Sequence, residues 1–550
     1  MLVAEAVGRA LAGLGVDTVF GVVGSGNFHV TNALAAGGAR FVAARHECGA
    51  ATMADAYART SRGVSAVSVH QGCGLTNAMT GIAEAAKSRT PVLVLAADTA
   101  GAAVRSNFRV DQDGLALAVG AVPERTHTPQ TAVADAARAY RTALVQRRTV
   151  VLNLPLDVQA APCPQGAAAV PPAPELQPPR PAPAAVAALA DALARARQPV
   201  FVAGRGARIA RARASLERLA DAAGALLATS AVVKGLFNGN PWYLDVSGGF
   251  ASPLAAELIR GADLVVGWGC ALNMWTMRHG ALIGPGATVA QVDLDVDAIG
   301  AHRPVDLGVV GDVDQTALAV ADELEARGAA APGYRSPELG RRIAAEHRWR
   351  DVPFDDSSDG SRIDPRTLSV ALDDLLPAER VVAVDSGNFM GYPSMYLSVP
   401  DDDGFCFTQA FQSIGLGLAT AVGAALAQPE RLPVAALGDG GALMAIAELE
   451  TVVRLGLPMV VVVYDDEAYG AEVHHFGPDG HPLDIVRFPP ADIASIGRGF
   501  GCEGVTVRAE ADLGAADEWV KGPRDRPLVI DAKIVSDRGS WWLEEAFRGH

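Results

Sequence analysis

The stretch from residue 434 to 472 constrains the fold of this chain more than any other. Val434–Leu437 and Met459–Tyr464 are short apolar runs of the kind found in buried strands. The apolar residues between them recur at helical spacing: Leu443, Ile446, Leu449 and Val453. A strand, a helix and a second strand in this order form a crossover, which makes the two strands parallel. The stretch therefore predicts part of a parallel α/β sheet.

Each of the two predicted strands runs into an acidic turn. The first continues as Gly438-Asp439-Gly440-Gly441 and the second as Asp465-Asp466-Glu467-Ala468. Ligands of open parallel sheets bind beyond the carboxyl ends of the strands, so Asp439 and Asp466 should face one crevice. Glycines let the backbone approach a phosphate, and the N-terminus of the following helix favours its charge. The two carboxylates would repel that phosphate without a divalent cation, and Mg²⁺ fits an all-oxygen site best.

The pattern therefore predicts a metal-bridged diphosphate. For the GDGG turn alone, a simple tight turn followed by a solvated acidic loop would be the better interpretation. The second acidic turn, one helix and one strand later, favours the metal site instead.

Length, charge and cysteine usage limit the class of protein. A chain of 550 residues is too long for one hydrophobic core and suggests about three domains. A formal net charge of −16 argues against a nucleic-acid partner and against binding to an anionic membrane surface. No apolar run reaches the roughly 20 residues that span a bilayer, and the first ten residues carry no basic leader, so we expect a cytoplasmic protein. Six scattered cysteines predict free thiols and no disulfide.

Two breaks in composition divide the chain. Residues 161–185 are mostly Pro and Ala, which favours an extended linker, and residues 331–362 form a second, charged linker. The blocks 1–160, 186–330 and 363–537 alternate short apolar runs with alanine-rich helical patterns, which predicts three parallel-sheet α/β domains followed by a tail at 538–550. The predicted strands lie near Val19 and at Phe41–Ala44, Val64–Val69, Val92–Ala96, Val150–Leu154, Val200–Ala203, Leu264–Trp268, Thr288–Val292, Val381–Val384, Val434–Leu437, Met459–Tyr464 and Leu528–Ile530.

With its GDG turn and second acidic turn, the chain resembles the thiamine-diphosphate-dependent enzymes. The resemblance implies pyrimidine-binding, central and diphosphate-binding domains, in that order. It also implies that thiamine diphosphate and Mg²⁺ are the cofactors, with Asp439, Asp466 and the carbonyl of Ala468 as metal ligands. The further cofactor-binding residues would be Gly438, Gly440, Gly441 and Tyr469. The family's usual Asn-Asn pair is Asp465-Asp466 here, which adds a negative charge next to the metal.

Three more residues match cofactor-binding positions of the family. Glu47, in Arg45-His46-Glu47, begins a predicted helix, where a glutamate is more often a cap than a catalyst. The resemblance implies that it hydrogen-bonds the aminopyrimidine ring of a cofactor held by the neighbouring subunit. We therefore expect a homodimer or homotetramer with active sites at the subunit interface. Ile414 matches the bulky residue that supports the bent cofactor, although an ordinary core isoleucine would look the same, and Asn388 could line the cleft.

The residues that would face the substrate decide the reaction. Ser25 and His70 match the serine and histidine of benzoylformate-decarboxylase-like members, although a core histidine is the alternative for His70. Glu472 lies where pyruvate-decarboxylase-like members place a catalytic glutamate, and Gln112 resembles a substrate-facing glutamine. A histidine that titrates near neutrality, facing an acid, can relay protons.

The function expected from the resemblance is decarboxylation of a 2-oxo acid. In the first hypothesis the resulting acyl carbanion passes to a second carbonyl compound, an aldehyde or keto acceptor, as in acetolactate-synthase-like carboligases. In the alternative it is protonated and released as an aldehyde, which Ser25 and His70 favour. A third hypothesis is a catalytically silent cofactor-binding regulatory protein.

The middle block raises the question of a second cofactor. Some relatives bind FAD in this domain and others bind nothing there. The glycine pair Gly204-Arg205-Gly206 does not complete a dinucleotide motif, because Ile209 stands where the third glycine belongs. We therefore expect no redox flavin.

Overall fold

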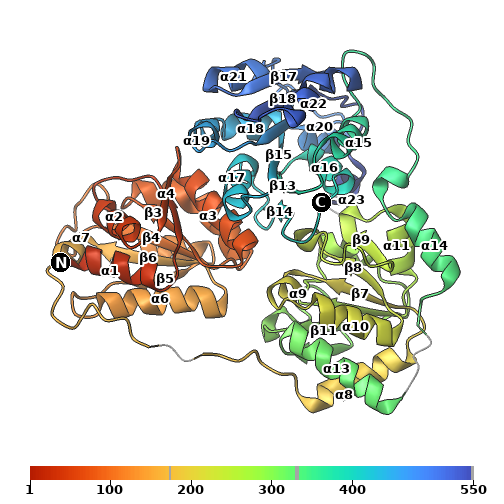
Figure 1. The fold of residues 1–550 in the computed structure, drawn as a ribbon, viewed down its shortest axis with the longest axis horizontal. Helices are drawn as coiled ribbons and strands as arrows, with labels where there is room; N and C mark the ends of the chain where they lie inside the picture. The colour runs from red at the N-terminus through yellow and green to blue at the C-terminus, as the bar shows by residue number, and fades with distance from the viewer. Residues whose placement is uncertain (173–174, 329–332, 547–550) are drawn as a thin grey trace.

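Three parallel six-stranded sheets, each flanked by helices, make up the structure, a computed structural model that describes residues 1–172, 175–328 and 333–546 (Figure 1). The prediction of three parallel-sheet α/β domains is thereby confirmed. The remaining residues fall in the two predicted linkers, at the end of the middle block and in the C-terminal tail, and lie outside the described part.

The first and third sheets have the same strand order. The first runs β2-β1-β3-β4-β6-β5 and the third β14-β13-β15-β16-β18-β17. The first-sheet strands are β1 (Thr18–Gly21), β2 (Arg40–Ala43), β3 (Ser65–Val69), β4 (Val92–Asp98), β5 (Val122–Arg125) and β6 (Val150–Pro155). Those of the third are β13 (Arg380–Val384), β14 (Phe405–Phe407), β15 (Leu432–Gly438), β16 (Val460–Asp465), β17 (Glu503–Val507) and β18 (Leu528–Lys533). In each sheet the strand order reverses between two neighbouring strands, β1 and β3 in the first sheet and β13 and β15 in the third. Ligands of such sheets bind at this point.

The middle sheet has a different order, β12-β11-β10-β7-β8-β9, which reverses between β7 and β10. Its strands are β7 (Pro199–Ala203), β8 (Leu226–Thr229), β9 (Tyr243–Val246), β10 (Leu264–Trp268), β11 (Thr288–Asp293) and β12 (Leu307–Val310).

Helices connect the strands in all three domains. The first domain has α1 (Val3–Gly13), α2 (Phe28–Ala36), α3 (Glu47–Ser61), α4 (Cys73–Lys87), α5 (Gln112–Ala118), α6 (Ala132–Gln146) and α7 (Leu156–Ala160). The middle one has α8 (Pro183–Arg195), α9 (Arg205–Ile209), α10 (Arg213–Ala223), α11 (Pro253–Arg260), α12 (Met274–Met277) and α13 (Val313–Arg327), with α14 (Pro337–Glu346) following. The third has α15 (Pro365–Leu375), α16 (Gly391–Tyr396), α17 (Gly417–Ala427), α18 (Asp439–Met444), α19 (Glu448–Arg454), α20 (Gly470–Phe476), α21 (Ile493–Phe500), α22 (Gly514–Lys521) and α23 (Trp541–Ala546).

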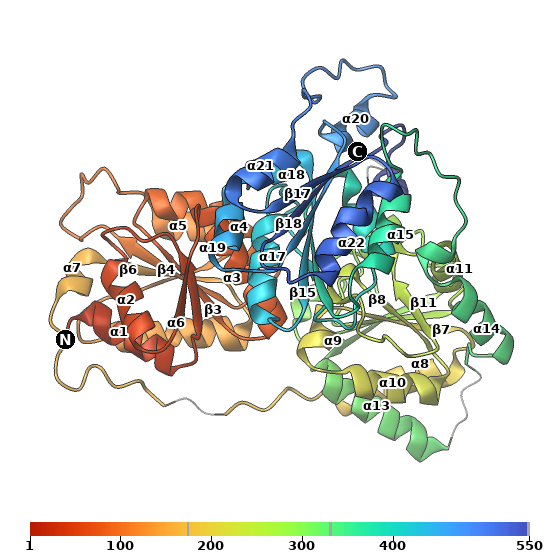
Figure 2. The same cartoon turned by 45° about the horizontal axis from the view of Figure 1, so that its top comes forward.

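The first and third domains share one hydrophobic core, in which α3 packs against α17 (Figures 1 and 2). Both helices are rich in alanine and glycine, so their backbones approach closely. A Cβ atom at Gly423 of α17 would lie 2.2 Å from the carbonyl oxygen of Met53 in α3, a distance that no side chain tolerates. Small residues at these positions therefore set how the two domains sit against each other.

Charged residues join all three domains at one point. Arg62 of the first domain and Arg208 of the middle domain both bind Asp403 of the third, with N–O distances of 2.9 and 2.8 Å.

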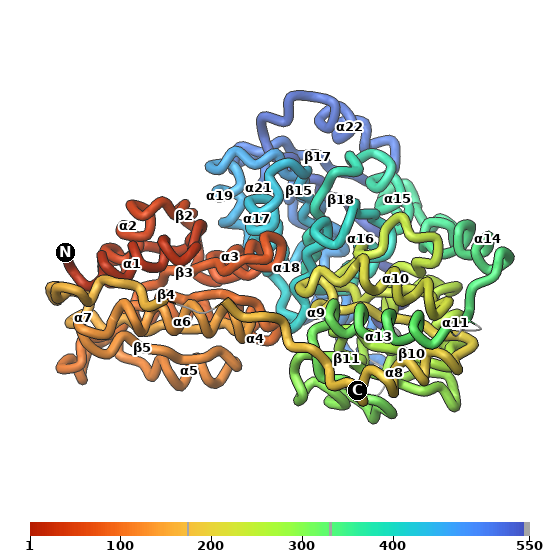
Figure 3. Tube along the Cα trace, turned by 60° about the horizontal axis from the view of Figure 1, so that its bottom comes forward, coloured from red at the N-terminus to blue at the C-terminus, as the bar shows by residue number. Residues whose placement is uncertain are grey.

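The tube view shows α7 at the end of the first domain and α8 at the start of the middle domain (Figure 3). The described part of the chain has no helix long and apolar enough to cross a membrane.

The structure corrects several details of the sequence-based fold. The predicted linker 331–362 contains α14, because Leu339 and Ile343 on one face of that helix pack against the middle domain. The predicted linker 161–185 ends early, since α8 begins at Pro183. The single helix expected after Asp439 is two short helices, α18 and α19. Six strands were not predicted: β5, β8, β9, β12, β14 and β17.

Candidate functional site

The predicted diphosphate turn lies at the carboxyl edge of the third sheet. Asp385, Asp439 and Asp466 follow the ends of β13, β15 and β16, which are adjacent strands. The order of the sheet reverses between β13 and β15. The structure thus brings the two predicted metal ligands, Asp439 and Asp466, to one edge, as expected from the crossover.

The two carboxylates lie in an environment that disfavours negative charge. Asp439 is buried at the first position of α18. Burial and the neighbouring Asp466 and Asp465 raise the pKa of Asp439, and burial and Asp465 raise the pKa of Asp466. A bound cation would reverse this penalty, because it stabilises both ionised carboxylates.

The donor set at this edge suits a hard cation. Asp439, Asp466 and the carbonyl of the buried Ala468 would offer oxygen ligands only, the kind that Mg²⁺ prefers. A Cβ atom at Gly470 would lie 2.2 Å from Oδ2 of Asp466, so glycine is needed beside this carboxylate. Among the described residues no group of three or more His, Cys, Asp or Glu forms a metal site, and the expected set, with two carboxylates, does not require one.

Asp465, which replaces the usual asparagine, has a cationic partner of its own. Its carboxylate forms an ion pair with Lys533 at the end of β18, and Lys533 also binds Asp531 at 3.1 Å. The other oxygen of Asp465 accepts the backbone N–H of Glu467 at 3.0 Å. The extra negative charge noted in the sequence is therefore offset in part by Lys533, which Asp465 shares with Asp531.

Asp385 holds the loop that carries Ile414. Its buried carboxylate accepts the backbone N–H groups of Gly415 and Leu416 at 2.9 and 3.2 Å, and that of Ser386 at 2.9 Å. Burial raises the pKa of Asp385 to about 6, despite these bonds. Ile414 is partly exposed beside the Asp439 turn, which suits a residue that contacts a ligand there.

Two further predicted cofactor residues line the same edge. The ring of Tyr469 lies so close to Gly440 that a Cβ atom there would be 2.7 Å from it. Asn388 is buried, and its side-chain oxygen accepts the backbone N–H of Ser540 at 3.0 Å. The indole N–H of Trp542 donates to the Asn388 carbonyl at 3.0 Å, so the C-terminal tail packs on this strand end.

A second group of candidate residues lies at the corresponding edge of the first sheet. Ser25 follows β1 and His70 follows β3, the strands between which the order reverses. The Oγ atom of Ser25 lies 3.4 Å from Nε2 of His70, and Nδ1 of His70 lies 3.0 Å from the carbonyl oxygen of Gln71. Because a carbonyl oxygen can only accept, Nδ1 must carry the proton, which leaves the Nε2 lone pair free to accept from Ser25.

Glu47 lies next to this pair. It is the first residue of α3, and one of its carboxylate oxygens accepts the side-chain N–H of Asn77 at 3.1 Å. A Cβ atom at Gly74 would lie 3.5 Å from the Glu47 carboxylate and 3.1 Å from the His70 Cβ. Ser25, Glu47 and His70 therefore come together at one corner, from three adjacent strands.

Comparison with known proteins agrees with this arrangement. Three family models match the chain: the N-terminal TPP-binding domain of thiamine pyrophosphate enzymes at residues 1–118, the central domain at 186–320 and the C-terminal TPP-binding domain at 385–532. A probable 2-ketoarginine decarboxylase of Pseudomonas aeruginosa is 31% identical, over 92% of this chain and 89% of its own length. The chain belongs to the thiamine pyrophosphate enzymes.

Other relatives carry different names. A sulfoacetaldehyde acetyltransferase of Castellaniella defragrans is 26% identical over 94% of this chain and 90% of its own. An acetolactate synthase large subunit of Parasynechococcus marenigrum is 28% identical over 96% and 87%. The family resemblance inferred from the sequence is confirmed.

Two candidate residues of this thiamine pyrophosphate enzyme stand apart from the corner formed by Ser25, Glu47 and His70. Gln112 is buried. Its side-chain N–H donates to Asn153 Oδ1 at 2.7 Å, and its side-chain oxygen accepts the Gly72 N–H at 2.9 Å. Gln112 therefore supports the turn after His70 from the interior of the domain. Glu472 is exposed on α20.

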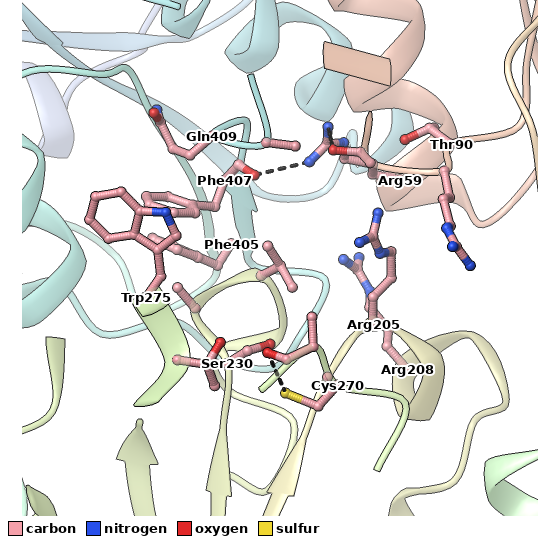
Figure 4. A pocket seen from close by; sticks show the side chains of 18 of the residues that line it. Arg59, Thr90, Arg205, Arg208, Ser230, Cys270, Trp275, Phe405, Phe407 and Gln409 are labelled. Carbon is pink, nitrogen blue, oxygen red and sulfur yellow. Dashed lines mark hydrogen bonds between the residues drawn. The ribbon is translucent and has the colours of Figure 1, made fainter. Parts of the chain in front are cut away.

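A cavity of about 450 Å³ lies where the three domains of the thiamine pyrophosphate enzyme meet (Figure 4). Arg59, Arg205 and Arg208 line one side of it, and Trp275 and Phe405 the other. Arg205 makes no hydrogen bond or ion pair within the described residues, and burial, with nearby Arg59 and Arg89, lowers its pKa to about 10. Arg205 therefore gives this side of the cavity a positive charge that suits an anionic group, whereas Arg59 and Arg208 are already paired with acids. The absence of a redox flavin from the middle domain stays a prediction.

Proposed function

We propose that the protein uses thiamine diphosphate and Mg²⁺ to decarboxylate a 2-oxo acid and release the aldehyde. The placement of Asp439 and Asp466 at the switch point of the third sheet, beside a glycine turn, supports the cofactor, and the contact of Ser25 with His70 supports release of the aldehyde. The cofactor, when bound, supplies the electron sink that lets a 2-oxo acid lose carbon dioxide.

The third domain would hold the cofactor. Asp439, Asp466 and the Ala468 carbonyl would bind Mg²⁺, and the N-terminus of α18 would face the diphosphate with Gly440 and Gly441 beside it. Ile414, on the loop fixed by Asp385, would press against the organic part of the cofactor and exclude water there.

Residues of the first domain would carry out the proton transfers. Glu47, oriented by its bond from Asn77, would share a proton with the aminopyrimidine ring. Nε2 of His70 is the only ring nitrogen left to exchange a proton, and Ser25 bonds to it. A protonated His70 would donate from Nε2 to the reacting carbon, and this step ends in an aldehyde.

The complete site would form between two copies of the chain, in a homodimer or homotetramer. Within the described residues no hydrogen bond or ion pair joins Ser25, Glu47 or His70 to the third domain. A second copy would bring its Asp439 edge to this corner. The 2-oxo acid would bind in the resulting cleft, as would any aldehyde or keto acceptor.

Carboligation is the second candidate function. It is supported by the relatives named as acetolactate synthase and acetyltransferase. In that case the acyl group would bond to the carbon of an acceptor carbonyl, and His70 would give its proton to the acceptor oxygen instead of to the reacting carbon. Glu472, which is exposed on α20, would then face the second substrate.

Product analysis separates these functions. The enzyme, loaded with thiamine diphosphate and Mg²⁺, is given pyruvate, benzoylformate or 2-ketoarginine, with and without an acceptor aldehyde. Aldehyde and carbon dioxide formed equally in both cases support the decarboxylase. Consumption only with the acceptor replaces it by the carboligase, and tight cofactor binding without consumption of any 2-oxo acid would favour a silent regulatory protein.

A further inference from the structure

A buried carboxylate of the third domain binds the segment that leads into Glu47. Glu448, the first residue of α19, is 2% exposed. Its Oε1 atom accepts the backbone N–H groups of Arg45 and His46, each at 3.0 Å. These two residues directly precede Glu47, so the third domain fixes the backbone from which that side chain projects.

The contact is built into both partners. The hydroxyl of Thr451, one turn further along α19, donates to Oε2 of Glu448 at 2.6 Å and holds the carboxylate in place. A Cβ atom at Gly49 would lie 2.4 Å from Oε1 of Glu448, so any side chain at this position would displace the carboxylate. The carboxylate thus lies against the N-terminus of α3, where backbone N–H groups and the helix dipole favour an anion.

The same helix makes a second, weaker contact with this segment. Glu450 binds the Arg45 side chain at 2.5 Å, but the Arg45 side chain is 50% exposed. An exposed pair of this kind contributes little to stability, whereas two N–H groups bonded to a buried carboxylate cost much more when they lose their acceptor. We therefore expect Glu448 to determine the orientation of residues 45 and 46, and Glu450 offers a matched control on the same helix.

We propose that Glu448 is a positioning residue that sets the direction of the Glu47 carboxylate through the backbone of residues 45 and 46. Its catalytic consequence rests on the proposed function, whereas its structural consequence does not. When Glu448 is removed, the first turn of α3 loses its anchor and Glu47 loses its fixed direction, while the metal and diphosphate residues stay in place.

Three variants test this role. Glu448→Ala removes the acceptor. Glu448→Gln keeps an oxygen for the two N–H groups and can donate to Thr451 instead of accepting from it. Glu450→Ala removes the exposed contact to Arg45, together with the pair that Glu450 forms with Arg454 inside α19. The readouts are amide hydrogen exchange of residues 44–50 without cofactor, calorimetric binding of thiamine diphosphate with Mg²⁺, and turnover.

The expected pattern distinguishes positioning from general damage. Glu448→Ala should speed exchange in residues 44–50 and lower turnover, each at least about tenfold, because two buried N–H groups lose a charged acceptor. Its cofactor affinity should stay close to that of the unchanged protein. Glu448→Gln and Glu450→Ala should remain within about threefold in every readout.

The proposal is overturned if folded Glu448→Ala shows unchanged amide hydrogen exchange in residues 44–50. It is also overturned if Glu448→Gln loses as much turnover as Glu448→Ala. If the alanine variant does not fold, Glu448→Asp, which withdraws the oxygens by one methylene, is measured and judged by the same criteria. A protein that binds no cofactor would refute the proposed function, yet the exchange measurement would still decide the role of Glu448.

Discussion

The two corners of the candidate site balance their charges in opposite ways. In the third domain Asp439 and Asp466 raise each other's cost of ionisation, and neither forms an ion pair with a cationic side chain among the described residues. In the first domain Ser25, His70 and Glu47 are more exposed and already hydrogen-bonded within the chain. The contrast supports the proposal that one corner binds a cation and the other moves protons.

The sharpest test of this division is Asp439→Ala. The variant should lose Mg²⁺-dependent binding of thiamine diphosphate by about a thousandfold or more, because it deletes a buried oxygen ligand. Calorimetry with and without Mg²⁺ measures the loss. Cofactor that still copurifies with the variant would remove Asp439 from the metal site.

Glu47→Gln tests the opposite corner. We expect cofactor affinity within a few-fold of the unchanged enzyme but a loss of turnover of about a thousandfold, because the amide cannot exchange a proton with the cofactor ring. Binding and initial rates are measured on the same preparation. An unchanged rate would exclude Glu47 from the chemistry.

Lys533→Met should destabilise the third domain by about 3 kcal/mol, because it leaves Asp465 and Asp531 buried without a cation. Urea unfolding measures this change. The double variant Lys533→Met with Asp465→Asn should recover part of the loss. If the two effects simply add, the charge of Asp465 is not balanced by Lys533.

His70→Ala should lower aldehyde formation by about a hundredfold, since Nε2 can no longer donate. Ser25→Ala, which keeps the ring, should cost less. Initial rates of aldehyde formation measure both losses, and an unchanged rate in His70→Ala would assign the proton transfer to another group.

The smallest expected effect concerns pH and Asp385. Its pKa is raised in the folded state to about 6, so the folded form holds this proton more tightly than the unfolded form. The stability that this provides is complete below the ordinary pKa near 4 and is lost as the pH rises through 6. Relative to Asp385→Asn, unfolding free energy should therefore fall by an amount on the order of 2 kcal/mol between pH 4 and 7. Parallel stability curves would contradict this.

The sequence predicted the strand ends that carry chemistry better than it predicted the sheet edges. Asp439 and Asp466 follow strands that are almost entirely apolar, and Ser25 and His70 follow strands that are buried along their whole length. The edge strand β17 escaped prediction because it is short, partly exposed and starts with a charged residue.

The positioning residues could not be read from the sequence for a related reason. Asp385, Glu448 and Lys533 act on segments far away in the chain, so local periodicity does not reveal them. A lysine at the end of an apolar strand was the one signal available for Lys533. The break between α18 and α19 was missed because apolar residues keep helical spacing across it.

Calorimetric titration of the metal-free protein with thiamine diphosphate, in the presence and absence of Mg²⁺, tests the central claim most directly. Saturable binding of one cofactor per chain that requires Mg²⁺ is the predicted result. No binding heat when both are added together would contradict the assignment of the Asp439–Asp466 edge as a diphosphate site.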